Sequence, residues 1–168
     1  LDPEIVEQVQ KTFIKMREDG LIYREERLVN WCVKHQTALS DLEVKHIKQK
    51  DPLYYMKYGP FSIATVRPET KFGDTALAVN PEDKRYKSYI GKEIEAEGLL
   101  GKFKIKVIAD RAVDPKFGTG VIKVTPAHDF NDYEISLRHN LERKQVIDQF
   151  GKLNNLTGPY AGMKIEEA

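Results

Sequence analysis

Residues 123–132 gather several side chains that are able to do chemistry. The segment contains an amine, a hydroxyl, an imidazole and two carboxylates, namely Lys123, Thr125, His128, Asp129 and Asp132. Binding and catalytic residues concentrate in the short connections between regular elements. The pattern therefore predicts a functional site at this point of the chain.

The residues around this segment predict a strand, a turn and the start of a helix. A Gly-Thr-Gly turn precedes β-branched residues, which favour a strand over residues 121–125. Pro126 ends that strand. Asp129 then stands where a helix N-cap is expected, and Asn140 is a suitable left-handed end for the helix. The candidate side chains would thus surround one strand-to-helix corner.

Two other interpretations of the acidic residues stay open. Asp129 and Asp132 would serve only as helix caps, because carboxylates at a helix start accept free backbone N–H groups. Alternatively, both carboxylates with His128 and His139 would suit the divalent metal of a phosphohydrolase. His139 lies about three helical turns beyond His128, which makes one shared metal ion difficult.

A second polar stretch follows the strand predicted over residues 61–66. It holds two hydroxyls, a cation and a carboxylate: Thr65, Arg67, Glu69 and Thr70. Pro68 breaks the strand there, and Asp74 comes just before the next predicted strand. The simplest interpretation is a polar turn with an Arg–Glu pair, and the alternative is a second group of site residues.

The N-terminal residues predict an amphipathic helix. Asp2 and Pro3 are typical of a helix start, and Gly20 of a helix end. Apolar residues recur at helical spacing along one face: Ile5, Val9, Phe13 and Met16. Such a stripe needs a surface to pack against, either the core of this domain or another part of a larger protein.

The rest of the chain predicts a mostly β fold with flanking helices, in the α+β class. The strand-like runs are residues 21–23, 27–32, 42–47, 53–58, 61–66, 76–79, 103–108 and 121–125. Many short strands at close spacing are typical of a barrel or sandwich. Residues 58–61 predict a hairpin turn, residues 81–86 a short helix, and the residues after Lys152 a loop and exit linker.

Composition limits the class of protein further. The chain has 168 residues, 40% hydrophobic and 32% charged, which is typical of one globular domain. A net charge of +1 gives no overall basic footprint for nucleic acid. Cys32 is the single cysteine, so the sequence excludes an internal disulfide framework and a cysteine zinc site. No apolar run suits a signal peptide or membrane span, and the expected location is the cytoplasm.

Several motifs together resemble the editing domain, or connective insertion, of valyl-tRNA synthetases in the class I aminoacyl-tRNA synthetase family. The matching stretches are residues 29–32, 37–44, 65–70, 73–76, 80–86, 118–129, 131–134 and 138–139. The sequence Lys-Val-Thr-Pro-Ala-His-Asp at residues 123–129 resembles the valyl branch in particular. The Gly-Thr-Gly turn is shared with the leucyl and isoleucyl editing domains.

The resemblance implies the β-barrel-like fold of a class I synthetase editing domain. It divides the chain into a flanking helical segment from the parent enzyme (residues 1–22), the editing domain (23–153) and a C-terminal exit segment (154–168). The sequence contains neither the His-x-Gly-His nor the Lys-Met-Ser-Lys-Ser motif of the parent's activation site. An excised editing domain that does not activate valine is therefore expected.

The activity that the resemblance implies is hydrolysis of the ester of mischarged threonyl-tRNA(Val). Its partners would be the 3′ end of the aminoacylated tRNA and the catalytic and anticodon-binding domains of the parent synthetase, with no membrane, metal or cofactor. Two alternatives remain: a module that binds the tRNA end without hydrolysis, and the metal-dependent phosphohydrolase.

The resemblance also implies a role for each candidate residue. Asp132 would anchor the α-amino group of the substrate. Asp129, Lys123 and Thr125 would recognise the threonine hydroxyl. Thr65, Arg67 and Thr70 would lie near the terminal adenosine and the ester. Phe117 would stack on the adenine, the alternative being a core phenylalanine.

The sequence pairs no serine or cysteine with a suitable base, so a positioned water is the expected nucleophile. Lys123 and Arg67 are candidates to stabilise the developing oxyanion. The predicted catalytic set is Asp132, Lys123, Arg67 and Thr70. The resemblance assigns no contact to Glu69 or His128, and for Asp74 a structural turn role is left open beside a role in the site.

Overall fold

The structure of this chain is a computed structural model that describes residues 2–167. Its α-helices are α1 (Pro3–Glu18) and α2 (Phe130–His139). Its strands are β1 (Asn30–Cys32), β2 (Thr37–Leu39), β3 (Tyr54–Tyr58), β4 (Phe61–Thr65), β5 (Ala76–Val79), β6 (Glu93–Gly98), β7 (Gly101–Ala109) and β8 (Val121–Val124). Single 3-10 turns cover Asp41–Glu43, Pro68–Gly73, Lys87–Tyr89 and Asn155–Tyr160.

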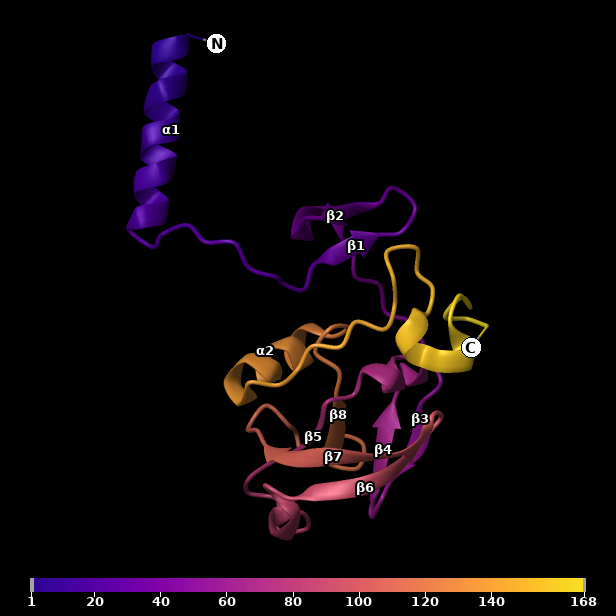
Figure 1. The fold of residues 1–168 in the computed structure, drawn as a ribbon. Coiled ribbons are helices and arrows are strands. Elements are labelled where there is room, and N and C mark those ends of the chain that lie inside the picture. The colour runs from indigo at the N-terminus through magenta and orange to yellow at the C-terminus, as the bar shows by residue number, and fades with distance from the viewer. Residues whose placement is uncertain (1, 168) are drawn as a thin grey trace.

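A four-stranded sheet in the order β6-β7-β5-β8 forms the centre of the fold (Figure 1). Strand β5 runs parallel to β7 and antiparallel to β8. The β3–β4 hairpin packs across this sheet, with β4 against β8 and β3 against β6. The six strands thus surround one core, although the described sheets stay open and do not close into a hydrogen-bonded barrel. The predicted mostly β fold with flanking helices is confirmed.

Strand β5 is buried on both faces, so its alternating side chains supply two cores. Leu77 and Val79 point into the core between the sheet and the hairpin. Ala76 and Ala78 point the other way, where they pack with Ile135 of α2. Because the small alanines let α2 lie close to the sheet, the start of this helix comes near the end of β8.

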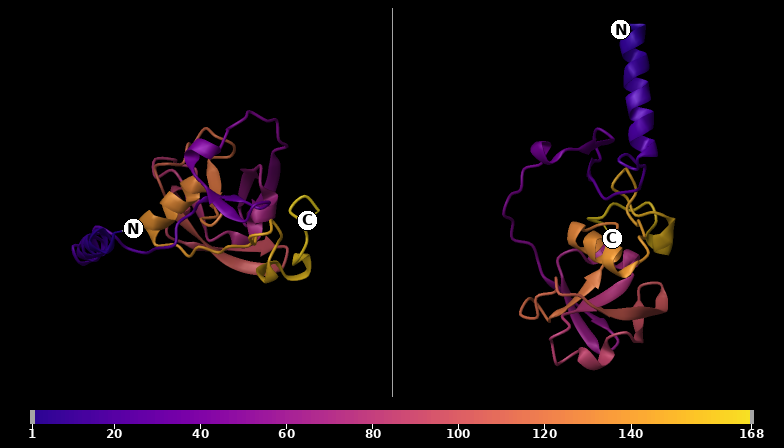
Figure 2. Two further views of the ribbon diagram at one scale, coloured as in Figure 1. Left: turned by 90° about the horizontal axis from the view of Figure 1, so that it is seen from above. Right: turned by 90° about the vertical axis from the view of Figure 1, so that its left-hand side faces the viewer.

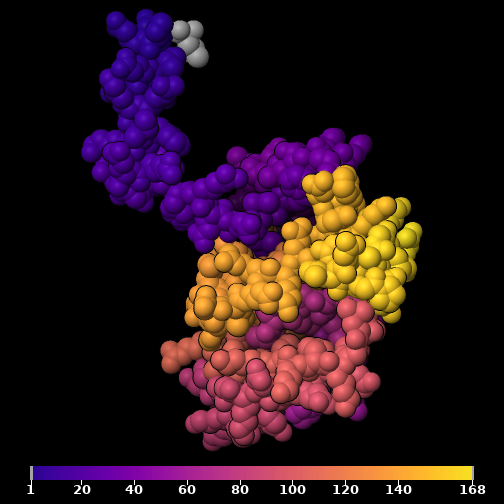
Figure 3. All heavy atoms as spheres, in the orientation of Figure 1, coloured from indigo at the N-terminus to yellow at the C-terminus, as the bar shows by residue number. Residues whose placement is uncertain are grey.

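Helix α1 begins as predicted but packs against nothing in the described chain. Asp2 caps it by accepting a hydrogen bond from the Glu4 N–H at 2.9 Å. None of its residues is buried, and Phe13 is 56% exposed. Figures 2 and 3 show α1 standing apart from the rest of the molecule. The interpretation as a core helix is therefore wrong. No helix among the described residues is both long and apolar enough to cross a membrane.

The hairpin turn at residues 58–61 and strand β5 are confirmed, whereas other predicted elements differ. Residues 21–23 and 42–47 form no strand, because they lie on exposed stretches without a neighbouring strand to pair with. Strand β6 was not predicted: its glutamates are poor strand formers, but they face lysines of β7 across the ladder.

The predictions for residues 81–86 and for the tail after Lys152 are also corrected. Residues 81–86 form turns, and the following short helix is Lys87–Tyr89. The tail after Lys152 is ordered by the 3-10 helix Asn155–Tyr160 and by a bridge between Lys152 and Lys164. Thr157 in this tail is fully buried.

Candidate functional site

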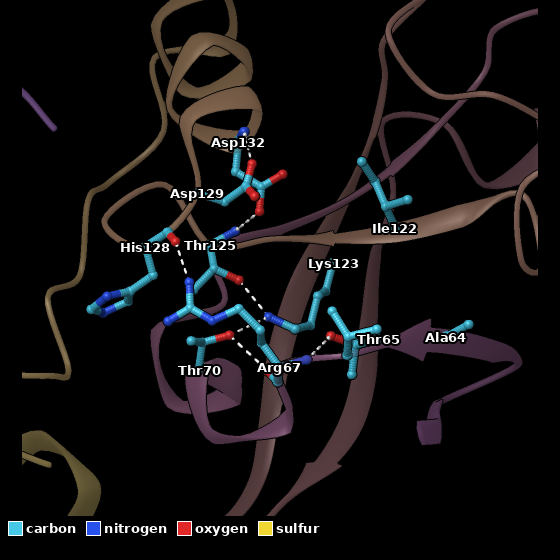
Figure 4. A pocket seen from close by; sticks show the side chains of 11 residues that line it. Ala64, Thr65, Arg67, Thr70, Ile122, Lys123, Thr125, His128, Asp129 and Asp132 are labelled. Carbon is cyan, nitrogen blue, oxygen red and sulfur yellow. Dashed lines mark hydrogen bonds between the residues drawn. The ribbon is translucent and has the colours of Figure 1, made fainter. Parts of the chain in front are cut away.

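A cavity of about 130 Å³ lies between the end of β4, strand β8 and the start of α2 (Figure 4). Its lining residues are Ala64, Thr65, Val66, Arg67, Thr70, Ile122, Lys123, Thr125, His128, Asp129 and Asp132. Both polar stretches singled out in the sequence therefore meet at one cavity. All the predicted site residues line it except Phe117.

The corner between β8 and α2 forms as the sequence pattern predicts. Asp129 is the N-cap, and its Oδ1 accepts the N–H groups of Asn131 and Asp132 at 2.8 and 3.1 Å. Asn140 ends the helix in the left-handed conformation, with φ 50° and ψ 48°. The capping interpretation therefore holds for Asp129. It fails for Asp132, whose carboxylate reaches back to the N–H of Thr125, the residue directly after β8.

The Asp132 carboxylate is buried beside the cavity. Its Oδ2 accepts the Thr125 N–H at 2.8 Å, and the residue is 8% exposed. Burial raises the pKa of Asp132 to about 6, against the lowering effect of the Thr125 N–H, and the neighbouring Asp129 adds to the rise. No other hydrogen bond to this carboxylate is made by the described residues. A buried carboxylate with an unused oxygen can bind a cation.

Lys123 projects from β8 toward the cavity, and its ammonium group donates three hydrogen bonds. Its Nζ donates to Thr125 Oγ1 at 2.6 Å, to Thr70 Oγ1 at 2.7 Å and to Asp74 Oδ1 at 3.0 Å. An ammonium has three donors, so this set is complete. The Lys123 side chain is 8% exposed and that of Asp74 is 1% exposed. This lysine forms a buried ion pair.

Asp74 is the centre of what we call the buried network: Tyr58, Thr70, Asp74, Lys123 and Thr125. Its Oδ1 also accepts the Thr125 hydroxyl at 2.8 Å, and its Oδ2 accepts the Tyr58 hydroxyl. Burial raises the pKa of Asp74, opposed chiefly by the charge of Lys123. Burial likewise raises the pKa of Tyr58, with a further contribution from the Asp74 charge. The described residues contain no fully buried side-chain polar atom without a partner, so the unused oxygen of Asp132 is accessible.

Sequence reasoning missed this role of Asp74 and Tyr58. A lysine between β-branched residues of a buried strand requires an acidic partner. Asp74 precedes β5, which pairs with β8 so that Leu77 lies opposite Lys123. The lysine was therefore a usable signal, but the pairing of these strands was needed to identify its partner.

What we call the open wall consists of the lining residues Thr65, Arg67 and Asp129, together with Glu69, which pairs with Arg67 but does not itself line the cavity. Arg67 forms the predicted pair with Glu69, with Nε 3.0 Å from Oε1. Its guanidinium also donates to the His128 carbonyl at 2.6 Å, and its N–H to Thr65 Oγ1 at 3.1 Å. The Arg67 side chain is 44% exposed. It crosses from the 65–70 segment to the helix corner while still facing solvent (Figure 4).

His128 links the corner between β8 and α2 to the backbone at Val146. Its Nε2 accepts the Val146 N–H at 2.9 Å, and Figure 4 shows the ring turned away from Lys123 and Asp132. Burial lowers the pKa of His128 to about 4, with smaller contributions from the charges of Arg67 and Lys123. The imidazole is therefore neutral near pH 7 and serves as a hydrogen-bond acceptor.

The two histidines considered for a metal site point to different partners. His139 Nε2 lies 3.0 Å from Asp110 Oδ2, whereas His128 binds the Val146 N–H. Within the described part of the chain, no three His, Cys, Asp or Glu side chains come together as a metal site would require. The geometry thus gives no support to a phosphohydrolase built on these residues.

Phe117 lies outside the cavity lining and is 65% exposed, so it is not a core phenylalanine. Its neighbour Gly118 approaches the cavity wall: a Cβ atom at Gly118 would lie 3.2 Å from Ala64 Cβ. An exposed ring beside the site is compatible with stacking, and that role stays a prediction.

Comparison with known proteins identifies the family. The family described as tRNA synthetases class I (I, L, M and V) matches residues 1–160. This chain therefore belongs to the class I tRNA synthetases.

The relatives identify the branch. The chain is 48% identical to the valine--tRNA ligase of Bdellovibrio bacteriovorus over 174 residues, 50% to that of Petrotoga mobilis over 169, and 49% to that of Lactobacillus johnsonii over 175. These alignments cover 97–100% of this chain. They cover 19–20% of the relatives, so the chain spans about a fifth of their length. The resemblance to the valyl branch is confirmed.

Proposed function

We propose that this chain is the editing domain of a valyl-tRNA synthetase and hydrolyses the ester of threonyl-tRNA(Val). The observation that carries this proposal is the position of Asp132: a buried carboxylate with an unused oxygen on a polar cavity. An aminoacyl ester presents an ammonium next to its reactive carbonyl. A charge-assisted contact to Asp132 would hold that ammonium and so place the ester in the cavity.

The need for a second site follows from the similarity of threonine and valine. An apolar synthetic pocket cannot strongly reject a near-isostere that only adds a hydroxyl, a limit for which the valyl enzyme is itself a standard example. A polar editing cavity would reverse the preference, because the threonine hydroxyl finds hydrogen-bond partners there that the corresponding methyl group of valine cannot use. The lining of this cavity by hydroxyls and carboxylates supports such a preference.

The geometry refines which residues would contact the hydroxyl. Lys123 donates all its hydrogen bonds to Thr70, Asp74 and Thr125, so no donor is left for the substrate hydroxyl. Its role would be to form the base of the cavity. Asp129 and Thr65 remain for the substrate hydroxyl. Asp129 is exposed and caps the helix through one oxygen, and the Thr65 hydroxyl proton has no acceptor among the described residues.

Hydrolysis in this cavity would depend on orientation and charge. A water oxygen bonds to the ester carbonyl carbon, and the bond from that carbon to the ribose oxygen breaks. The ribose oxygen takes up a proton from the attacking water and leaves as the ribose hydroxyl, and the amino acid is released with a free carboxylate. Arg67, whose half-exposed guanidinium lies beside the helix corner, would stabilise the negative charge that develops on the carbonyl oxygen. Lys123 would add little to this field, because its charge is paired with that of Asp74.

The proposed domain division follows the predicted one. Residues 1–22, which include the separate helix α1, would belong with the remainder of the parent enzyme, residues 23–153 would form the editing domain, and residues 154–168 the exit segment. The catalytic and anticodon-binding domains of that enzyme would supply most tRNA contacts. The near-neutral charge of this chain is consistent with that division of labour.

Deacylation assays test the proposal directly. Threonyl-tRNA(Val) and valyl-tRNA(Val) are incubated with the chain, and release of each amino acid is followed with and without a chelator. We expect faster release of threonine, unaffected by the chelator. Binding without release would favour the tRNA-end binding module, and loss of activity with the chelator would contradict the water-only mechanism.

A further inference from the structure

The connection between β7 and β8 has no helix or strand of its own, and at Gly118 it touches Ala64, a residue that lines the cavity. Residues 110–120 form a series of turns that carry Phe117. Gly118, at φ +56°, lies against Ala64 of the cavity wall, where a Cβ atom would be only 3.2 Å from the alanine Cβ. The position of this loop therefore sets where Phe117 stands relative to the cavity.

Side chains of residues 80–86 hold the backbone of this loop at three places. Each donates a hydrogen bond to a loop carbonyl: Asn80 Nδ2 to Val113 O at 2.8 Å, the Arg85 guanidinium to Pro115 O at 2.7 Å, and the Tyr86 hydroxyl to Thr119 O at 2.9 Å. A free loop would leave these carbonyls to water. The three bonds bracket Phe117 on both sides in the sequence.

The donors are themselves fixed. The Arg85 guanidinium donates to both carboxylate oxygens of Asp83, whose side chain is only 6% exposed. The Tyr86 ring packs on Phe61 of the hydrophobic core, with centroids 5.6 Å apart. Gly120, at φ +79°, leaves space for the Arg85 guanidinium, which a side chain at that position would meet. The loop is thus tied to a rigid part of the fold.

We propose that Asn80, Arg85 and Tyr86 are positioning residues that hold Phe117 beside the cavity as a stacking platform for the terminal base of the substrate. The inference rests on the proposed function and extends it to residues that do not line the cavity. The ring is exposed while its backbone is tied, so little conformational freedom is lost when a base stacks on it. Stacking of a base on an aromatic ring is tolerant of base identity, and a ring whose backbone is already fixed loses less freedom on binding.

The experiment compares Tyr86→Phe with Tyr89→Phe as the matched control. Both remove one phenolic hydroxyl from a ring packed on Phe61, but only Tyr86 bonds the loop. Each variant is titrated with an acceptor-stem minihelix whose terminal adenosine is replaced by 2-aminopurine riboside, whose fluorescence is quenched on stacking. Steady-state deacylation of threonyl-tRNA(Val) is measured in parallel.

We expect Tyr86→Phe to weaken the quenching and to raise KM about three- to tenfold with little change in kcat, and Tyr89→Phe to change neither. Phe117→Ala should raise KM about five- to a hundredfold. In that background Tyr86→Phe should add less than about twofold, because the platform is already gone. Arg85→Lys, which cannot bind Asp83 and Pro115 in the same way, should resemble Tyr86→Phe.

Unchanged quenching and KM in Tyr86→Phe would overturn the inference, as would a full additional effect of that substitution on top of Phe117→Ala. These outcomes differ from a failure of the proposed function, in which the unsubstituted chain releases no threonine. The 2-aminopurine titration still measures the effect of Tyr86 on stacking in that case.

Discussion

The buried network and the open wall both contribute residues to one cavity, but their charged groups differ in exposure to solvent. In the network, every proton of Lys123 is used and its ion pair with Asp74 is hidden from solvent. On the open wall, Arg67 pairs with Glu69 while nearly half of its side chain stays exposed. A charge on the first side is committed to the protein, whereas a charge on the second side is available to a ligand.

This difference divides residues that the sequence motifs group together. Lys123 and Thr125 belong to the architecture of the cavity, and Arg67 and Asp129 to its accessible surface. Asp132 lies at the boundary, being buried like the network but with an unused oxygen. Substitutions on the two sides should therefore separate stability from activity.

The largest effect on stability is expected for Lys123→Met. The substitution leaves Asp74 buried without its counter-charge, and removing one partner of a buried ion pair costs about 3–5 kcal/mol. The free energy of unfolding, measured with urea at pH 7, checks this value. The control is the double variant Lys123→Met with Asp74→Asn, which removes both charges and should recover at least half of the loss. A single variant that loses less than about 1 kcal/mol would show that the pair is not buried in solution.

Asp132→Asn should move stability and activity in opposite directions. The folded-state pKa of about 6 exceeds the unfolded value, so folding disfavours the ionised form. The resulting penalty is absent below about pH 4, grows as pH rises to about 6 and is constant above. Asparagine removes the charge and keeps an acceptor for the Thr125 N–H, so at pH 7 the variant should gain up to about 3 kcal/mol.

In the deacylation assay, the same variant should lose about tenfold to a hundredfold in kcat/KM for threonyl-tRNA, because the ammonium loses its charged partner. The unsubstituted chain should lose activity as pH falls below about 6, where Asp132 becomes protonated. A stabilised variant with full activity would mean that Asp132 does not contact the substrate.

The pKa of His128 predicts that its contribution to stability rises with pH, which is opposite to the effect of Asp132 on stability. Its folded-state pKa of about 4 lies below the unfolded value of 6.5, so the unfolded chain binds the proton more tightly. Its contribution to stability is fully present above pH 6.5 and is lost as pH falls toward 4, by about 1–3 kcal/mol after allowance for its partial exposure. Urea unfolding of the chain and of His128→Gln across this range provides the measurement. The two stability curves should converge toward pH 4, and parallel curves would contradict the assignment.

Local structure around the site could be predicted because it depends on nearby residues. The Asp129 cap, the Asn140 end of α2, the hairpin at residues 58–61 and strand β5 all follow from short-range chemistry. The grouping of the 65–70 and 123–132 segments came from the resemblance to a family. The motif pattern alone left both segments open to simple turn and cap interpretations.

Long-range pairing accounts for what could not be predicted. The bond between Lys123 and Asp74 joins residues 49 positions apart, and only the register of β5 with β8 brings them together. Strand β6 forms because β7 offers lysines opposite its glutamates. Helix α1 shows the reverse case: its apolar stripe was recognised, but a sequence pattern does not state what covers it.

The smallest effect on stability is expected on the open wall, for Glu69→Gln. The ion pair with Arg67 is exposed on the arginine side, and such pairs contribute about 0–1 kcal/mol. The matched control is Glu95→Gln, which breaks the exposed pair with Lys102, neither residue of which lines the cavity. Both variants should unfold within about 1 kcal/mol of the unsubstituted chain.

The deacylation rate should nevertheless distinguish these two variants. Glu69 restrains the Arg67 guanidinium on one side while the His128 carbonyl holds it on the other, so Glu69→Gln should change kcat for threonyl-tRNA several-fold and Glu95→Gln should leave it unchanged. Equal rates for both variants would place Arg67 outside the reaction. A stability loss of several kcal/mol in Glu69→Gln would move this pair into the buried network, and the contrast between the two sides of the cavity would no longer hold.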